Sequence, residues 1–389
     1  MIMTVELQDV FREHFDDYQT SHAVTFDQWK AAQAIMGCRT SAYGGRVQEC
    51  PECDYTTILY NSCRNRHCPK CQSLAQLKWV DARREDLLPV TYFHVVFTLP
   101  SELELLVLQN QKTLYSCLFK AVAETLKELA SDPKYLGAQL GFTSVLHTWG
   151  QNLLFHPHIH CIVPNGGLTP HGTFQQGSDR FFLPLRVVSK MFRGKFLALL
   201  QAAFDKEELE FHGSIEHLNH RQYFAKLRHG LYQKDWYVHT ERAFDGPEAV
   251  LQYLGRYTHR IAISNERILK LEDGMVTFSW KDYRDNQKKI MVLPAHEFIR
   301  RMLLHILPCG FMRIRHYGLL ASCNRSTKLK QCQRLAGQAE AKARFRDLTS
   351  LEILTIVLGR DVTLCPSCGK ASMYLTQYLG RSHAPPRCA

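Results

Sequence analysis

The chain has 389 residues, of which 45% are hydrophobic and 22% charged, a composition typical of soluble globular proteins. It contains no run approaching the roughly 18 to 20 uncharged apolar residues that a membrane helix requires. Its acidic, amphipathic N-terminus lacks the layout of a signal peptide. We therefore expect a cytosolic protein without a membrane partner, long enough for two or three domains.

The positive charge is concentrated in one part of the chain. The formal net charge is +11, and residues 281–347 contain 15 Lys/Arg against 5 Asp/Glu. Residues 1–90, by contrast, contain 10 basic and 12 acidic residues. A concentrated basic segment suits a polyanion such as nucleic acid, although a solvated surface would also explain it.

The predicted elements alternate between helices and strands. Apolar spacing and turn residues predict helices at 5–36, 73–88, 102–129, 187–204, 246–260 and 295–306. Strands are expected at 90–100, 142–149, 156–163, 235–244 and 311–317, with a hairpin at 268–280 around Asp273-Gly274. The strands at 142–149 and 156–163 can pair across the turn TWGQN. This order indicates an α+β fold with a mostly antiparallel central sheet and flanking helices.

Two Cys-x-x-Cys pairs lie close together in CPECDYTTILYNSCRNRHCPKC (50–71). Fourteen residues separate them, a spacing at which two knuckles can close a tetrahedron of thiolates around Zn²⁺. Fourteen cysteines in a cytosolic chain argue against a disulfide framework. Cys63 and His67 are surplus, and Cys63 is the first substitute. The expected ligands of a structural zinc site are Cys50, Cys53, Cys68 and Cys71.

A third pair, Cys365 and Cys368, lies near the C-terminus. It has the form of half a zinc site, with His383 and Cys388 as candidate partners. The spacing of these four is loose, so the sequence leaves a second zinc ion open.

Three histidines alternate in FHPHIHCIVPNGG (155–167). Alternate side chains of a strand share a face, so His156, His158 and His160 point the same way. Two or three imidazoles in register commonly bind a divalent metal. A ligand from elsewhere is also expected: His147, on the neighbouring predicted strand, comes first, ahead of Gln151 and His156.

Two tyrosines lie one helical turn apart in QYLGRYTHR (252–260). Tyr253 and Tyr257 therefore share one face of the predicted helix, although such a pair alone is more often part of a core. Gly255 between them costs the helix about 1 kcal/mol relative to alanine, as expected where a backbone approaches closely. A tyrosine can attack a phosphate that a histidine-held ion polarises and that Arg256 or Arg260 helps to neutralise.

Several motifs occur in the order typical of a known family. His158-Ile159-His160 resembles the His-hydrophobe-His motif of the HUH endonucleases, and FHVVFTLP (93–100) resembles the strand that precedes it in rolling-circle replication initiators. SCRNRHCPKCQ (62–72), HTWGQNLLFHPHIHC (147–161), QYLGRYTHRIAISNERI (252–268) and FMRIRHYGLLA (311–321) resemble the two-tyrosine rolling-circle transposases of the insertion-sequence-91 family. The similarity covers residues from about 10 to about 335.

The resemblance implies a reaction and its cofactors. Tyr253 or Tyr257 would attack single-stranded DNA at the end of the element, forming a 5′-phosphotyrosine and freeing a 3′-OH. Mg²⁺ or Mn²⁺ would bind His158, His160 and His147, Zn²⁺ would bind the N-terminal cysteines, and no nucleotide cofactor is needed. Arginines of the knuckle, the tyrosine helix and the basic segment would bind DNA: Arg64, Arg66, Arg256, Arg260, Arg313 and Arg315.

The same resemblance divides the chain into three parts. Residues 1–90 would form a helical zinc-binding domain, and residues 91–335 the nuclease domain, with its basic part at 281–347. Residues 348–389 would form a C-terminal tail that carries the third cysteine pair.

Three alternatives stay open. A replication initiator or relaxase would share the nicking chemistry but not the zinc-knuckle and YLGRYTHR motifs. A zinc-ribbon DNA-binding protein with an inactive nuclease fold would not need both tyrosines and the histidines. A zinc hydrolase built on the histidine row would need a carboxylate base, and residues 142–167 contain no Asp or Glu.

Overall fold

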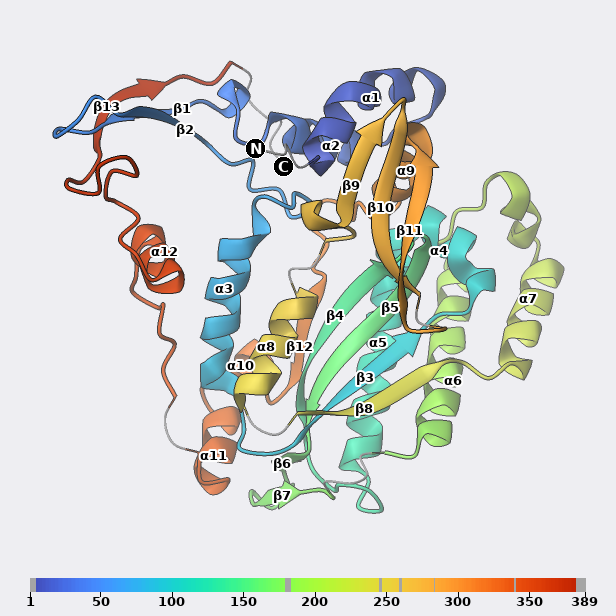
Figure 1. Ribbon diagram of the computed structural model, residues 1–389. Helices are drawn as coiled ribbons and strands as arrows, with labels where there is room; N and C mark the ends of the chain where they lie inside the picture. Colours follow the sequence, from blue (N-terminus) through green and yellow to red (C-terminus); the bar gives the residue numbers. More distant parts are fainter. Residues whose placement is uncertain are drawn as a thin grey trace.

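A five-stranded antiparallel sheet forms the centre of the molecule (Figure 1). The computed structural model describes residues 5–178, 183–244, 247–258, 261–282, 284–338 and 341–382. The strand order is β12-β4-β5-β3-β8, where the bounds are β3 Tyr92–Thr98, β4 Gly141–Trp149, β5 Phe155–Pro164, β8 Val238–Phe244 and β12 Ile314–Gly318. All four pairings are antiparallel, which confirms the predicted α+β fold.

Long helices cover one face of the central sheet. Phe97, Leu146 and Ile159 point to this face and are fully or almost fully buried. They pack in one core with α5 (Gln111–Ser131) and α6 (Leu185–Asp205), whose apolar residues recur at three- and four-residue spacing. This core fixes the sheet and thereby the positions of the side chains on its other face.

The opposite face carries the histidines and is covered by two other helices. These are α3 (Gln72–Ala82) and α8 (Pro247–Thr258), which contact each other (Figure 1). A cluster containing Tyr92, Ile162 and Val250 fills the space between helices and sheet. A Cβ at Gly255 would lie 3.4 Å from both Gln76 and Val80, so the glycine lets α8 approach α3 closely.

The N-terminal helices pack against a second sheet. α1 (Leu7–Ser21) and α2 (Phe26–Gly37) share a core with α9 (Ala295–Leu303) and the sheet β11-β10-β9, formed by β9 Ile268–Glu272, β10 Met275–Asp282 and β11 Gln287–Pro294. The hairpin expected at Asp273-Gly274 is present, and both residues have positive φ, +50° and +72°. The single helix expected at 5–36 is two helices, because Thr25 and Gln28 form a capping box that starts α2.

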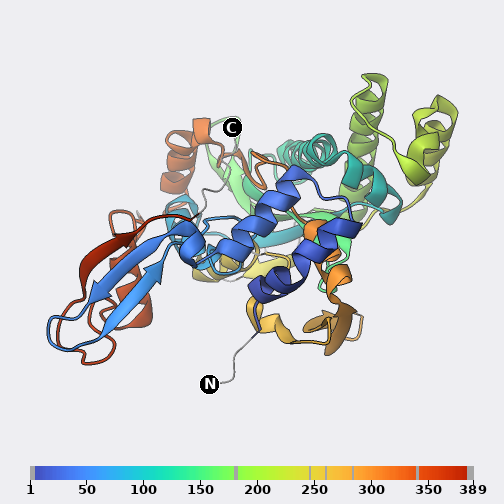
Figure 2. The same ribbon diagram turned by 90° about the horizontal axis from the view of Figure 1, so that it is seen from above.

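A third sheet joins the two ends of the chain. β1 (Gly45–Glu49) pairs with β2 (Thr56–Tyr60) on one side and with β13 (Tyr374–Leu379) on the other. The sheet projects from one side of the molecule (Figure 2). Within the predicted C-terminal tail, residues 348–389, β13 is hydrogen-bonded to the N-terminal hairpin, and α12 (Ser350–Leu358) precedes it.

The remaining described elements lie around the central sheet. They are α4 (Glu104–Gln109), α7 (Arg221–Gln233), α10 (Ser322–Arg325), α11 (Lys328–Leu335) and the hairpin of β6 (Gly166–Leu168) with β7 (Phe174–Gln176). Among the described residues, no helix has both the length and the apolar character needed to span a bilayer.

Candidate active site and cysteine clusters

The register of β4 and β5 brings three histidines together. His147 of β4 lies directly opposite His158 of β5, and His160 follows two residues later on the same face. One ring nitrogen of each lies within 4.8 Å of the others, and all three side chains are buried. These three form the histidine trio. The side chain of His156, by contrast, is exposed.

Hydrogen bonds select the ring nitrogens that could bind an ion. Nδ1 of His158 lies 2.6 Å from the carbonyl oxygen of His156, and a carbonyl can only accept, so Nδ1 carries the proton. Nδ1 of His160 lies 2.8 Å from Nε2 of His94. In both residues Nδ1 makes this contact, so an ion would bind at Nε2, in the arrangement common to metal-binding histidines. The donor set fits a divalent metal ion.

A tyrosine hydroxyl connects to this trio through His94. Oη of Tyr253 lies 2.5 Å from Nδ1 of His94, whose Nε2 contacts His160. Both His94 and Tyr253 are buried, and burial lowers the pKa of His94 to about 4, which keeps the ring neutral at pH 7. His94 lies in the motif FHVVFTLP (93–100), but no feature of the sequence predicts a role for it. Only the pairing of β3 with β5 places His94 beside the histidine row.

The second tyrosine lies one turn further along α8. The backbone of Tyr257 and Arg256 belongs to this helix, but their side chains lie outside the described part of the molecule, as does all of Arg260. Gln151, one alternative for the third metal ligand, accepts a hydrogen bond from Arg267 through its backbone oxygen. One ring nitrogen each of His147, His158 and His160 lies within 4.8 Å of the others, and His156 does not belong to this group, although its ring lies 5.2 Å from that of His158.

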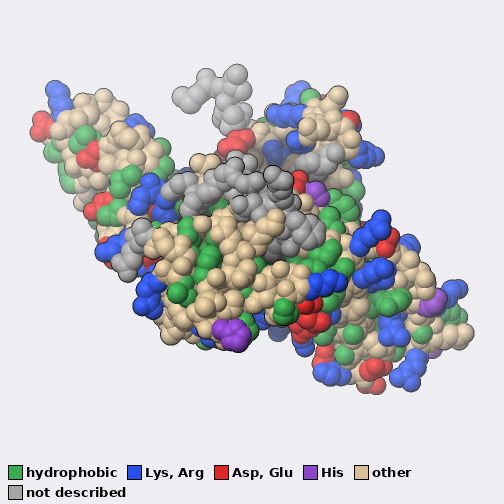
Figure 3. All heavy atoms as spheres, turned by 90° about the horizontal axis from the view of Figure 1, so that it is seen from below, with side chains coloured by type: hydrophobic (Ala, Val, Ile, Leu, Met, Phe, Trp, Pro, Cys, Tyr) green, Lys and Arg blue, Asp and Glu red, His purple; other side chains and the backbone are tan. Residues whose placement is uncertain are grey.

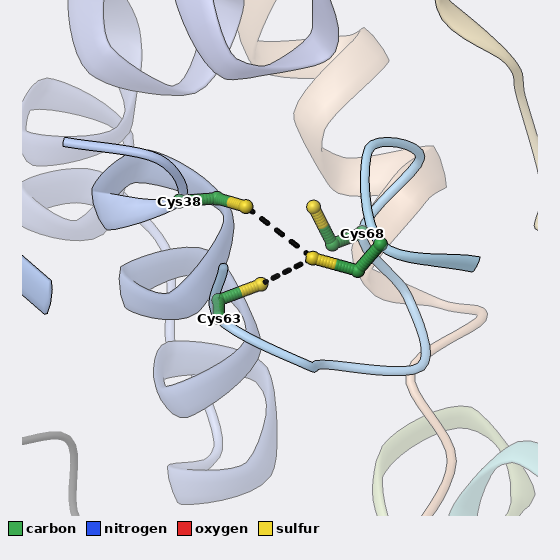
Figure 4. A group of neighbouring side chains, drawn as sticks. Cys38, Cys63 and Cys68 are labelled. Atoms are coloured by element: carbon green, nitrogen blue, oxygen red, sulfur yellow. Dashed lines mark hydrogen bonds between the residues drawn. The ribbon is translucent and has the colours of Figure 1, made fainter. Parts of the chain in front are cut away.

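The first cysteine cluster lies beneath the N-terminal helices. The thiols of Cys38, Cys63 and Cys68 point toward a common centre (Figure 4). Sγ of Cys71 completes the cluster, 3.4 Å from Sγ of Cys38 and 3.5 Å from Sγ of Cys63. Hydrogen bonds from Cys63 and Cys68 lower the pKa of Cys38 to about 7, which favours a thiolate.

The grouping of zinc ligands expected from the sequence was wrong. Cys68 and Cys71 belong to the first cluster, whereas Cys50 and Cys53 lie with Cys365 and Cys368 in a second one. The physical reason is the β1–β2 hairpin, which carries Cys50 and Cys53 in its turn and away from the 63–71 loop. The surplus Cys63 is a member of the first cluster, together with Cys38, which the sequence analysis did not single out.

The arginines predicted to bind DNA differ in their exposure and in their contacts within the protein. Arg64 is exposed. Arg66, however, donates to the carbonyl oxygens of residues 307, 308 and 311 at 3.2, 2.8 and 2.6 Å. Arg313 is 8% exposed, and its burial lowers the pKa to about 10. The guanidinium of Arg66 thus binds the backbone of residues 307–311, and the side chain of Arg313 is enclosed in the interior.

Arg315 and the rest of the basic segment are partly engaged within the protein. The guanidinium of Arg315 lies 4.2 Å from the ring centre of Phe119. Arg325, Arg344 and Arg346 form ion pairs with acidic residues that follow or end α3: Asp81, Glu85 and Asp86. On the face shown in Figure 3, basic side chains are spread over several parts with acidic ones among them. The excess of basic residues in 281–347 therefore does not by itself establish one continuous basic surface.

Two protein-family models match the chain. Residues 141–327 match the family described as "Putative transposase", and residues 10–99 match the "Transposase zinc-binding domain". The first match includes the histidine trio and both tyrosines, and the second includes the first cysteine cluster. The protein is thus a transposase with an N-terminal zinc-binding domain.

Two curated relatives make the assignment more specific. The chain is 46% identical to "Putative transposase y4qJ" of Sinorhizobium fredii (strain NBRC 101917 / NGR234), over 98% of both chains. It is 26% identical to the "Transposase for insertion sequence element IS801" of Pseudomonas savastanoi pv. phaseolicola, over 74% of this chain and 69% of the relative. The chain belongs to the insertion-sequence-91 family of transposases.

Proposed function

We propose that this transposase cuts and rejoins single-stranded DNA through a covalent phosphotyrosine intermediate. Tyr253 is the nucleophile, and His147, His158 and His160 hold a divalent ion, Mg²⁺ or Mn²⁺. The observation that carries the proposal is the chain of contacts from the Tyr253 hydroxyl through His94 to His160. Tyr257, four residues later in the sequence, is the second nucleophile.

The hydrogen bonds give His94 a defined role toward Tyr253. If Nε2 of His160 is reserved for an ion, its Nδ1 keeps a proton and donates it to Nε2 of His94. Nδ1 of His94 then carries the other proton and donates to the phenolic oxygen of Tyr253. A donor at this position stabilises the phenolate, which is the reactive form of the nucleophile.

The reaction then follows from the positions of these groups. The Tyr253 oxygen, after losing its proton to solvent, forms a bond to phosphorus while the bond from phosphorus to O3′ breaks. The freed 3′-oxygen takes up a proton, and the 5′ side stays linked to the protein. A bound ion would neutralise and polarise the phosphate. A 3′-OH attacks the ester in the reverse sense, so joining needs no nucleotide cofactor.

The cysteines of the first cluster fit a structural zinc site in the same enzyme. Four sulfurs within 4.8 Å of one another match the all-cysteine sites that stabilise small modules. Cys38 and Cys68 belong to the core formed with α1 and α2, so this ion would hold the N-terminal helices together. Arg64 on the exposed part of the loop, with Arg256 and Arg260 of the tyrosine segment, is left as a DNA contact.

The proposal is tested with labelled single-stranded DNA that carries an end of the element. The full-length protein should form a covalent adduct in Mg²⁺ or Mn²⁺ and none in EDTA, measured on a denaturing gel. Tyr253→Phe should lower adduct formation strongly, and the double change Tyr253→Phe, Tyr257→Phe should abolish it. Adducts that persist in the double variant would overturn the assignment of the nucleophiles.

A replication initiator or relaxase would give the same adducts and is distinguished by joining. The proposed enzyme should transfer the cleaved end to a second strand carrying a free 3′-OH, and the sequence of an element end should be required in the first strand. Cleavage without such end dependence would favour the alternatives.

A further inference from the structure

The second cysteine cluster lies outside both the active site and the first cluster. Cys50 and Cys53 lie in the turn that joins β1 to β2, and Cys365 and Cys368 lie between α12 and β13. Each pair has the Cys-x-x-Cys spacing, and all four sulfurs lie within 4.8 Å of one another. The two pairs come from opposite ends of the chain, 318 residues apart for Cys50 and Cys368.

The distances between these sulfurs fit a tetrahedral zinc site. Sγ of Cys50 lies 3.6 Å from Sγ of Cys368, and Sγ of Cys53 lies 3.8 Å from Sγ of Cys365. Four sulfurs about 2.3 Å from a central Zn²⁺ would be about 3.8 Å apart. The observed separations are much longer than the roughly 2.05 Å of a disulfide bond.

The backbone around the cysteines has the same form as in the first cluster. The amide of Glu52 donates to Sγ of Cys50 at 3.4 Å, and the amide of Asn65 donates to Sγ of Cys63 at the same distance. On the other side, the amide of Gly369 donates to the carbonyl oxygen of Cys365, and Gly369 has a φ of +67°. These tight turns place the thiols of each pair on one side, as a zinc knuckle does.

The apolar core of this region is too small to hold it together. Within residues 341–382, all of which are described, the buried apolar side chains are Phe345, Ile353 and Cys365. No residue of β2 or β13 is buried, and in β1 only Gly45 is. A small sheet without a core normally needs a metal or disulfides for stability. The cluster lies at the end of this sheet, where an ion would supply that link.

We propose that Cys50, Cys53, Cys365 and Cys368 bind a second structural Zn²⁺, which attaches the C-terminal segment 362–379 to the N-terminal hairpin as a three-stranded zinc ribbon. The ribbon is assembled from both ends of the chain, and the pairing of β1 with β13 depends on the ion. The matched zinc-binding domain, residues 10–99, contains only half of the ligands. The proposal is independent of the nicking chemistry.

Zinc content measured on the full-length protein provides the first test. Elemental analysis should give two zinc ions for the wild type and one for Cys50→Ser/Cys53→Ser. Cys365→Ser/Cys368→Ser and the variant with all four changes should also retain one, because both pairs serve the same ion. The exposed Cys323 offers a matched control, and Cys323→Ser should retain two. Two ions in the variant with all four changes, or one ion in the wild type, would overturn the proposal.

Hydrogen exchange tests the attachment itself. In Cys365→Ser/Cys368→Ser, the amides of β1 and β13 that pair in the wild type should lose protection together, whereas those of α1 and α2 should not change. Unchanged protection of β13 would show that the ion does not hold the strand.

A measurement on the unmodified chain covers the case in which the variants do not fold. The wild type is treated with increasing chelator, alkylated, and the labelled cysteines are mapped by mass spectrometry. Cys50, Cys53, Cys365 and Cys368 should become reactive as one group, separate from Cys38, Cys63, Cys68 and Cys71. Labelling of Cys365 and Cys368 without chelator, or independently of Cys50 and Cys53, would contradict the shared site.

Discussion

Oη of Tyr253 lies 2.5 Å from Nδ1 of His94, and this contact links the helix of the nucleophile to the strand beside the histidine trio. If His94 stabilises the phenolate as a donor, His94→Ala should lower the rate of adduct formation by about 100-fold or more. The optimum of the pH–rate profile should also shift upward, because an unassisted phenol ionises at higher pH.

The comparison that isolates this effect is His217→Ala. His217 is exposed in the segment before α7, so His217→Ala should leave both the rate of adduct formation and the pH–rate profile unchanged. His94→Gln, which keeps an N–H donor, should recover part of the loss. A loss of rate in His94→Ala without any shift of the pH–rate profile would show that His94 acts through packing and not as a donor to the phenolate.

The histidine trio predicts a clear order among single substitutions. His147→Ala, His158→Ala and His160→Ala should each reduce metal-dependent adduct formation by about 100-fold or more, since each removes one of three ligands. His156→Ala should stay within about 2-fold, because its exposed ring contributes no ligand and its carbonyl oxygen, which holds His158, is kept.

Binding of Mn²⁺ supplies a readout separate from activity. Titration followed by electron paramagnetic resonance should show weakened binding for the first three variants and wild-type binding for His156→Ala. Equal losses in all four would place His156 in the site instead of beside it.

The local part of this site could be predicted from the sequence. Alternation along 156–163 and the turn TWGQN were enough to place His147, His158 and His160 near one another, because hairpin strands are adjacent in the chain. His94 could not be found in this way. It lies 66 residues before His160, and only the register of β3 on β5 brings the two rings into contact.

The assignment of the cysteines to two clusters shows even more strongly that contacts between distant parts of the chain cannot be predicted from local sequence. Spacing alone allowed Cys50, Cys53, Cys68 and Cys71 to share one ion, and nothing local in the sequence excludes it. The choice is made by the pairing of β1 with β13, which delivers Cys365 and Cys368 to the hairpin from more than 300 residues away. Long-range strand pairing leaves no periodic signal in the chain that would reveal it.

Arg64 and Arg66, two residues apart, should respond to substitution in opposite ways. Arg66→Ala removes one donor from each of three carbonyl oxygens, of which that of Pro308 keeps another donor, the amide of Phe311. It should therefore lower the free energy of unfolding by about 1–3 kcal/mol. Arg64→Gln removes an exposed charge, so stability should hold while affinity for single-stranded DNA falls and the slope of log K against log salt decreases by about 0.7.

The two measurements are urea unfolding and binding titrations over a range of salt concentrations. The titrations are made at a temperature at which both variants are folded. A reduced salt slope in Arg66→Ala, together with unchanged stability, would show that its guanidinium reaches DNA after all.

Acid stability should depend on His305, which is fully enclosed between α9 and the central sheet. Its Nε2 donates to the carbonyl oxygen of Leu153 at 3.1 Å, so its Nδ1 accepts from the hydroxyl of Thr148 at 3.2 Å. Burial lowers the pKa of His305 to about 4, against about 6.5 in an unfolded chain. Between these two values the unfolded state binds a proton that the folded state does not.

Stability should therefore fall as the pH decreases from about 6.5 to about 4, and His305 alone should contribute up to about 3 kcal/mol of that loss. His305→Gln removes the titrating ring, so its urea midpoint should change less than that of the wild type between pH 7.5 and pH 5. The protonation of zinc-binding thiols affects both proteins alike and cancels in the comparison. The exposed His217→Gln should follow the wild type. If the urea midpoints of His305→Gln and the wild type changed equally with pH, protonation of the buried ring would not destabilise the folded state.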